Sequence, residues 1–250
     1  MKRIALISVH NEPNYGSVLQ SYALAYAIRK EGYICEYLNY TPVPSPSSFK
    51  SKAKKLVKSL FHRLGLLDQS KSEYSFWQTE AFKKQWLLFS DFHEKRIPYS
   101  RTLYDPTTIA IANTYYDSFI VGSDQTWSPF VTQQRYNINF LEFVEQGKFK
   151  GAYAPSLGTC RLPEDYVKKL QDKLSDFRYL SCREKLNADT LTSYLGRKVE
   201  YVLDPTLLIS SGEWSMISKP VDIPQSYILC YILGTKQCIS DFADYLCRVQ

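Results

Sequence analysis

The chain of 250 residues contains little histidine and no closely spaced pair of cysteines. The three histidines are separated by long stretches of sequence, and none of the six cysteines forms a C-x-x-C pair: His10, His62 and His93; Cys35, Cys160, Cys182, Cys230, Cys238 and Cys247. Structural zinc sites and histidine-based nucleophilic triads need such residues in groups. We therefore expect no metal site, and we expect the cysteines to be reduced, mostly buried thiols of a cytoplasmic protein.

Long apolar runs are also absent from the sequence. No stretch of 18 apolar residues exists to span a bilayer, and the run at residues 4–9 is shorter than the apolar core of a signal peptide. The net charge of +6 is mild, and much of it comes from residues 50–63. It suits an anionic small substrate or an anionic membrane surface. Nucleic acid is not an expected partner, because no arginine-rich run or zinc-finger spacing accompanies the charge.

Short apolar runs and amphipathic segments alternate along the chain. Strands are predicted at residues 4–9, 33–38, 116–121, 151–155, 179–182 and 199–203, and helices follow from residue 17, at 163–177 and at 184–194. Connections of this kind join parallel strands. We therefore expect an α/β fold with a Rossmann-like, doubly wound parallel sheet.

Composition shifts divide the chain into an expected N-terminal domain at residues 1–218 and a remainder at 219–250. A helical insertion is predicted at about residues 49–92, with a basic amphipathic helix near 53–64 that would suit peripheral contact with an anionic membrane at its inner face. A linker is predicted at residues 219–225, a strand at 227–233 and a helix at 238–249. This pair cannot bury both faces of a sheet, so we expect a shortened second α/β domain; the alternative is that it completes the first sheet.

The most informative polar segment is Gly122-Ser123-Asp124-Gln125, which precedes Trp127 and directly follows a predicted strand. Ligands bind at the carboxyl edge of open α/β sheets. An unpaired carboxylate and amide would cost on the order of several kcal/mol to bury there. We interpret the segment as part of a binding site, and the alternative is a polar turn that caps the next element.

Two further loops follow predicted strands. In the first, Asn14, Tyr15 and Gly16 precede a helix that carries Gln20, and a helix N-terminus suits an anion. The alternative is a plain helix cap formed by Asn14 or Ser17.

In the other loop, Arg183 directly follows a strand and begins a helix. A cation there opposes the helix dipole, which favours a functional role in binding phosphate or carboxylate. Ser156 lies in a small-residue loop that permits close approach of a ligand, although a plain turn is the alternative. We interpret Asp204 as the structural cap of a proline-initiated turn.

Five motifs in this order and spacing resemble the polysaccharide pyruvyl transferase family over residues 1 to about 215. They are N-Y-G-S-V-L-Q-S-Y-A-L at 14–24, G-S-D-Q-T-W at 122–127, Y-A-P-S-L-G at 153–158, S-C-R-E at 181–184 and V-L-D-P-T-L-L at 202–208.

The resemblance implies a two-domain fold similar to GT-B glycosyltransferases. It also implies transfer of pyruvyl from phosphoenolpyruvate, without a cofactor, to two hydroxyls of a sugar or lipid-linked oligosaccharide in cell-surface polysaccharide biosynthesis. Arg183 is implied to help hold the anionic donor. A histidine in the second domain is implied as the general acid, and residues 226–250 contain none.

We assign catalytic roles to Asp124 and Arg183, with Asp124 orienting the sugar hydroxyl or stabilising a cation. The expected substrate-binding set consists of Asn14, Tyr15, Gly16, Gln20, Gly122, Ser123, Gln125, Trp127 and Ser156. Two alternatives stay open: a nucleotide-sugar glycosyltransferase of similar fold, and a non-catalytic carbohydrate-binding protein.

Overall fold

The computed structural model describes residues 2–8, 14–42, 80–130, 136–159, 161–225, 227, 229 and 237–249. The chain forms two compact units, Met1–Ser210 and Ser211–Gln250. The basic helix predicted near residues 53–64 lies outside the described residues, as does most of the strand predicted at 227–233.

The first unit is built on a sheet of five parallel strands in the order β3-β2-β1-β4-β5. The strands are β1 (Arg3–Ile7), β2 (Ile34–Tyr40), β3 (Tyr99–Tyr104), β4 (Ser118–Val121) and β5 (Phe149–Ala152). Since β1 pairs with β2 on one side and with β4 on the other, the strand order reverses at this point. The predicted parallel α/β sheet is confirmed, and its topology is that of Rossmann-like folds.

Two shorter strands continue the parallel arrangement beyond β5. Strand β6 (Ser181–Cys182) pairs with β7 (Glu200–Tyr201). The segment before β6 joins the main sheet, because the Ala152 N–H donates to the Tyr179 carbonyl at 3.0 Å. The carboxyl ends of β1, β4, β5, β6 and β7 therefore follow one another along one edge.

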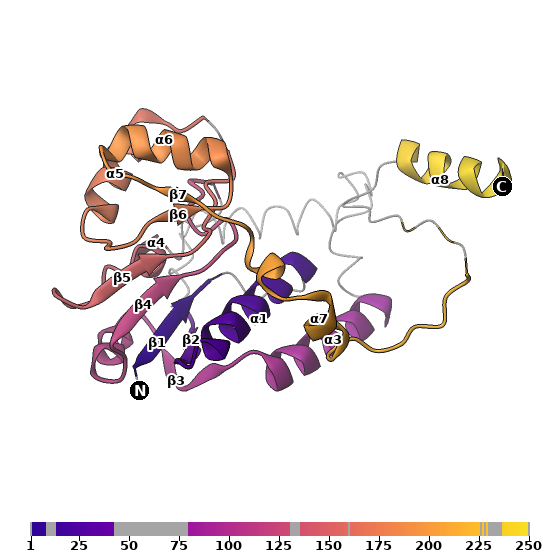
Figure 1. Cartoon of the computed structure of the whole chain (residues 1–250), viewed down its shortest axis with the longest axis horizontal. Helices are drawn as coiled ribbons and strands as arrows, with labels where there is room; N and C mark the ends of the chain where they lie inside the picture. The colour runs from indigo at the N-terminus through magenta and orange to yellow at the C-terminus, as the bar shows by residue number, and fades with distance from the viewer. Residues whose placement is uncertain are drawn as a thin grey trace, which may run out of the picture. The chain divides into compact units, whose positions relative to one another are not determined.

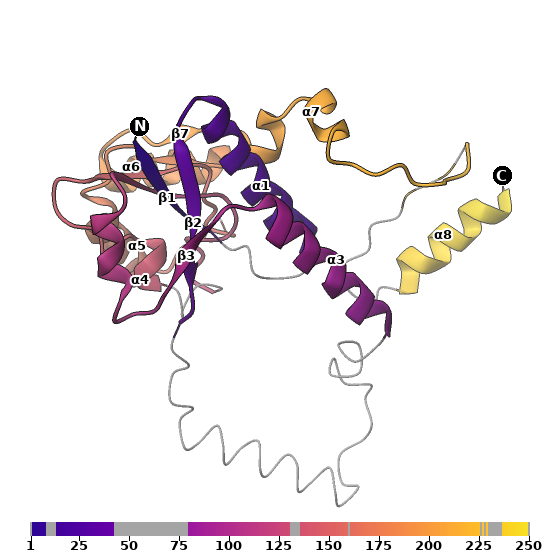
Figure 2. The same ribbon diagram turned by 90° about the horizontal axis from the view of Figure 1, so that it is seen from below.

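Helices cover both faces of the sheet (Figure 1). Helix α1 (Tyr15–Lys30) packs on one face, where the Tyr37 hydroxyl donates to the Ser21 carbonyl at 3.0 Å. Helix α3 (Glu80–Arg96) lies on the same side (Figure 2). The opposite face is covered by α4 (Tyr136–Asn139), α5 (Glu164–Leu174) and α6 (Lys185–Leu195). The main core lies between the sheet and these helices, and it includes Phe119, Trp127 and Leu170.

Several boundaries differ from the prediction. Strand β3 was not predicted, and α1 begins at Tyr15 rather than at Ser17. The 3-10 helices η2 (Ile109–Thr114) and η3 (Pro205–Leu208) complete the first unit. In η3 the Asp204 side chain accepts from the Thr206 N–H at 3.0 Å, which confirms the predicted cap.

The second unit contains α7 (Ser211–Ser215) and α8 (Gln237–Val249). Helix α8 confirms the helix predicted near residues 238–249. Its Cys247 is exposed, whereas Cys35 and Cys182 of the first unit are buried as expected. No helix in the described part of the chain is long and apolar enough to cross a bilayer.

Candidate functional site

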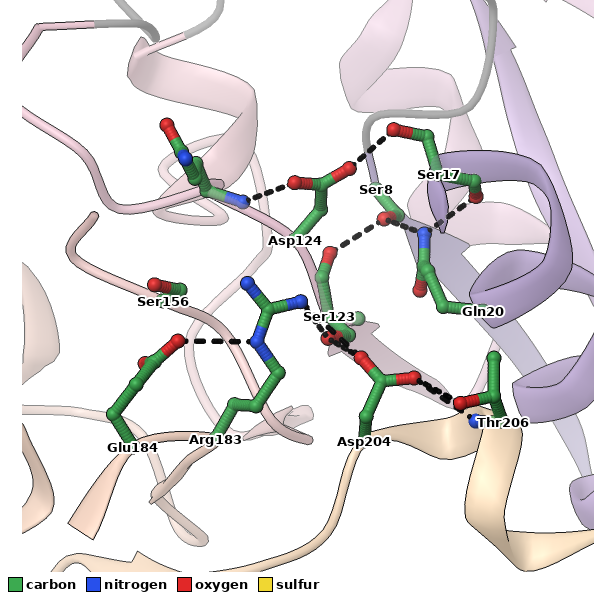
Figure 3. A network of polar contacts seen from close by, with 12 residues as sticks. Ser8, Ser17, Gln20, Ser123, Asp124, Ser156, Arg183, Glu184, Asp204 and Thr206 are labelled. Atoms are coloured by element: carbon green, nitrogen blue, oxygen red, sulfur yellow. Dashed lines mark hydrogen bonds and ion pairs between the residues drawn. The ribbon is translucent and has the colours of Figure 1, made fainter. Parts of the chain in front are cut away.

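Polar side chains from four strand ends and from the first turns of α1 meet at the carboxyl edge of the sheet (Figure 3). We call this group the edge cluster: Ser8, Ser17, Gln20, Ser123, Asp124, Arg183, Glu184 and Asp204. Its centre lies where the strand order reverses, after β1 and β4. This is the position at which ligands bind in open α/β sheets.

Gly122 and Ser123 directly follow β4 and position the edge cluster relative to the sheet. A Cβ at Gly122 would lie 3.0 Å from a Leu24 methyl and 3.4 Å from the Ser8 Cβ, so glycine permits close packing of β4 against α1. The completely buried Ser123 accepts from the Ser8 hydroxyl through its carbonyl at 2.7 Å. Its own hydroxyl donates to Asp204 Oδ2 at 3.0 Å. Ser123 therefore connects the end of β1 with the segment that follows β7.

Asp124 is held in a strained conformation with a φ of +82°. Its carbonyl accepts from the Thr126 and Ser156 N–H groups at 2.7 and 2.8 Å, which keeps the backbone in place. One carboxylate oxygen accepts from the Gln125 N–H at 2.7 Å, and the other accepts from the Ser17 hydroxyl. Ala154, after β5, has a φ of +58°. Non-glycine residues in this region cost about 1–3 kcal/mol each and are frequent at functional sites.

Arg183 is fixed by two of its three guanidinium nitrogens. Nε donates to Glu184 Oε1 at 3.1 Å, while Nη1 contacts Asp204 Oδ2 at 3.2 Å and the Ser123 hydroxyl at 3.3 Å. Nη2 has no hydrogen-bond partner among the described residues, and 29% of the side chain is exposed. The guanidinium can therefore offer two N–H donors to a ligand without losing its existing contacts.

The two carboxylates also set the protonation of this arginine. Burial alone would lower the pKa of Arg183, but Glu184 and Asp204 outweigh it and raise the pKa above its ordinary value. Asp204 is itself held by Thr206, whose hydroxyl donates to Oδ1 at 2.8 Å. Arg183 is thus a permanently charged donor in a fixed position.

The residues predicted at the start of α1 divide into two groups. Asn14 caps the helix by accepting from the Ser17 N–H at 3.2 Å, and Gly16 is exposed beside it. Gln20 is buried in the cluster, where its amide donates to the Ser8 hydroxyl at 3.0 Å and to the Ser17 carbonyl at 2.8 Å. Tyr15 instead packs on Phe89 of α3, with ring centroids 4.8 Å apart. Tyr15 therefore belongs to a different surface.

Trp127 has an exposed fraction of 0%. Its ring stacks on Phe140 at 6.0 Å, and its indole N–H donates to the Asn139 carbonyl at 3.2 Å. This placement assigns Trp127 to the core rather than to the ligand-facing set. After the left-handed turn at Asp124, Gln125 is exposed and the three residues that follow it are buried.

Gln125 and Ser156 lie around that turn. Gln125 is exposed, and Ser156 is buried with its hydroxyl accepting from the Gly158 N–H at 3.0 Å. Gln125 can reach a ligand directly, whereas Ser156 acts through the loop that it holds.

Sequence reasoning missed several members of the cluster. Ser8, Ser17 and Glu184 were not assigned to the site, and Asp204 was interpreted only as a cap. Tyr153 is a further neighbour, because burial, Tyr179 and Asp204 together raise the pKa of its phenol. The position of each at a strand end or first helical turn was the available signal.

The arrangement is suited to binding hydroxyl groups. It contains three carboxylates, from Asp124, Glu184 and Asp204, for one guanidinium, so the cluster is locally acidic. Cys182 offers no nucleophile, since burial raises its pKa to about 12 and the thiol stays protonated at neutral pH. Among the described residues, no group of three histidine, cysteine, aspartate or glutamate side chains is placed to hold a metal ion.

Comparison with known proteins identifies a family. A family model described as polysaccharide pyruvyl transferase matches residues 14–248. No curated protein and no solved structure matches the chain, so the similarity to two-domain GT-B folds stays a prediction. The matched residues run from the cap of α1 into α8 and include every member of the edge cluster except Ser8. The chain belongs to the polysaccharide pyruvyl transferase family.

Proposed function

We propose that this protein transfers pyruvyl from phosphoenolpyruvate to two hydroxyls of a sugar during cell-surface polysaccharide biosynthesis. The observation that carries the proposal is the fixed guanidinium of Arg183, whose Nη2 is available for a ligand. Its Nη1 donates to the hydroxyl of Ser123, and the next residue in the chain is Asp124, which has a strained backbone. Family membership supplies the reaction class. The donor and the acceptor are parts of the proposal.

The reaction balances without an oxidant or a reductant. The methylene carbon of the donor takes up a proton, and a sugar hydroxyl adds to C2. The bond between C2 and the phosphate oxygen then breaks, and inorganic phosphate leaves. A second hydroxyl adds to C2 to close the ketal. Of the two hydroxyl protons released, one balances the proton gained at the methylene carbon, and the other goes to phosphate or solvent.

Arg183 is assigned to the donor. Phosphoenolpyruvate carries a carboxylate and a phosphate, and a planar guanidinium can bind either group through two N–H donors. Glu184 and Asp204 position this guanidinium rather than contact the donor themselves.

Asp124 is assigned to the acceptor. A carboxylate accepts hydrogen bonds from hydroxyl groups, and in this position it orients the attacking hydroxyl and takes its proton. The exposed Gln125 beside it is suited to a further hydroxyl. We place the reaction in the cytoplasm, with peripheral contact to the inner face of the membrane.

A donor comparison tests the proposal. The full chain is incubated with phosphoenolpyruvate or with nucleotide sugars, and ligand-induced changes in thermal unfolding are recorded. We expect phosphoenolpyruvate to raise the Tm of the wild type and to have no effect on Arg183→Gln. An oligosaccharide is tested in a third incubation. Stabilisation by a nucleotide sugar alone would support the glycosyltransferase alternative, and stabilisation by the oligosaccharide alone would support a binding protein.

A further inference from the structure

An apolar groove lies between α1 and α3, outside the edge cluster. It has a volume of about 270 Å³, and its main lining residues are Tyr15, Val18, Leu19, Leu88, Phe89 and Phe92. Phe89 is a buried aromatic residue of the lining, 8% exposed, and its ring contacts the half-exposed ring of Tyr15. The rim of the groove is open, because Leu88 is 64% exposed. Within the part of the chain that the structure describes, the groove therefore has an open side.

The lining selects against sugars. Among the described residues, its one other lining member is Gln85, whose amide donates to the Tyr15 hydroxyl at 3.4 Å. A sugar placed there would bury hydroxyl groups with few partners, at a cost of on the order of 1–3 kcal/mol each. A hydrocarbon chain meets no such cost and gains by leaving water.

The groove and the edge cluster lie on opposite flanks of the same helical turns. Residues advance by 100° along a helix, so Tyr15, Val18 and Leu19 point away from Ser17 and Gln20. Ser17 and Gln20 face Asp124 and Ser8 (Figure 3), whereas Tyr15 packs on α3. The separation is one helix diameter, about 10–12 Å. A molecule that reached both sites would need a polar end and an apolar end.

We propose that the groove binds the hydrocarbon chain of a lipid-linked saccharide acceptor whose sugar lies at the edge cluster. This inference rests on the proposed function, which supplies the saccharide. The start of α1 lies between the two sites, and its partial positive charge suits the phosphate that joins sugar to lipid.

The surface of α3 supports the same occupant. Trp86 is 44% exposed, and the neighbouring Leu88 forms the rim of the groove. Lys83 and Lys84 lie one turn earlier on the helix and are exposed. Exposed tryptophan and leucine beside lysine are typical of helices that lie at a membrane surface. This part of α3, which forms the rim of the groove, is therefore suited to contact with a membrane surface.

Leu87 and Leu88 provide a matched pair for the test. They are adjacent on α3 and similarly exposed, at 67% and 64%, but only Leu88 lines the groove. Calorimetric titration of the full chain with farnesyl phosphate, below its micelle-forming concentration, is compared with titration by methyl phosphate. We expect farnesyl phosphate to bind the wild type at least about ten-fold more tightly. Leu88→Gln should remove this advantage, and Leu87→Gln should keep it within about two-fold.

Several results would overturn the inference. Equal affinity for the two phosphates would do so, as would equal losses in both variants. If the wild type forms a concentration-dependent dimer that Leu88→Gln abolishes, a second copy occupies the groove. If Leu88→Gln lowers the Tm as much as the substitution of a buried residue would, and the wild type binds no farnesyl phosphate, another segment of the same chain occupies the groove.

The binding assay also separates this inference from the proposed function, because it needs no turnover. Farnesyl binding without pyruvyl transfer would reject the proposed function alone. Pyruvyl transfer to soluble and lipid-linked acceptors with the same KM would reject the groove alone.

Discussion

At the residue scale, Asp124 combines a functional group with a strained backbone. Its φ of +82° is maintained by hydrogen bonds to its carbonyl from Thr126 and Ser156. Strain of this kind persists only where the surrounding structure imposes it. The conformation directs the carboxylate toward Ser17 on α1.

Two substitutions at Asp124 distinguish the effect of its strained backbone on stability from the effect of its carboxylate on activity. Glycine relieves the left-handed strain while alanine does not, so we expect Asp124→Gly to be more stable than Asp124→Ala by about 1 kcal/mol. Both should lose the proposed transferase activity, because both lack the carboxylate. Urea denaturation measures the first effect. Equal stability of the two variants would show that the backbone at this position carries no strain.

Arg183 and Asp204 form the second residue-scale unit. Their side chains are 29% and 23% exposed, so solvent weakens the pair relative to a fully buried one. We expect Arg183→Gln to cost about 1–2 kcal/mol, since it leaves Asp204 and Glu184 without their cation. Asp204→Asn in the same chain should recover part of the stability and none of the activity. A double-mutant cycle by chemical denaturation measures the coupling, and strictly additive effects would contradict it.

At the element scale, the start of α1 serves the fold through Asn14. The side chain accepts from the Ser17 N–H, so Asn14→Ala should cost about 1 kcal/mol and Asn14→Ser only a few tenths. Asn14→Asp keeps the cap but adds a negative charge. Unchanged phosphoenolpyruvate binding in Asn14→Asp would assign Asn14 to the cap alone, whereas weakened binding would place the donor near this helix end.

The junction of α3 and β3 contains a titratable contact. His93 Nδ1 lies 2.9 Å from the Tyr99 hydroxyl, and burial lowers the pKa of His93 from its ordinary value of 6.5. Between the folded and unfolded pKa values the unfolded chain binds more protons, so this group makes the folded state more stable as pH rises. Stability from His93 should therefore decline as pH falls through 6.5. The difference in unfolding free energy between wild type and His93→Gln, measured from pH 8 to 5.5, should shrink with acidification; a constant difference would contradict it.

Helices and strands with a strong local sequence pattern could be predicted. A strand that is recognised only by its hydrogen bonds to a neighbouring strand could not. Strands β1 and β4 are continuous apolar runs, and α5 and α6 show helical spacing. Strand β3 carries three exposed residues in its middle because it lies at the edge of the sheet, which leaves no apolar run in the sequence.

The same distinction holds within the site. Asp124 and Arg183 follow strands and could be assigned from position alone. The role of Asp204 as a partner of Arg183 depends on a contact across 21 residues, and no local pattern encodes it. The burial of Trp127 depends on its contacts with Phe140 and Asn139, which lie more than ten residues away and which the motif itself does not reveal.

At the scale of the whole molecule, the carboxyl edge of the sheet brings together an acidic cluster for hydroxyl groups and a fixed guanidinium for an anion. The apolar groove lies one helix diameter away, between α1 and α3. The central claim is that Asp124 and Arg183 act together in ketal formation.

The most direct measurement follows phosphoenolpyruvate labelled with ¹³C at C2 through a reaction with a panel of methyl glycosides and a lipid-linked sugar. Wild type should produce a ketal carbon and inorganic phosphate in equal amounts. Asp124→Asn should unfold at nearly the wild-type Tm and lose at least about 100-fold in rate. Ketal formation by Asp124→Asn at the wild-type rate would contradict the account.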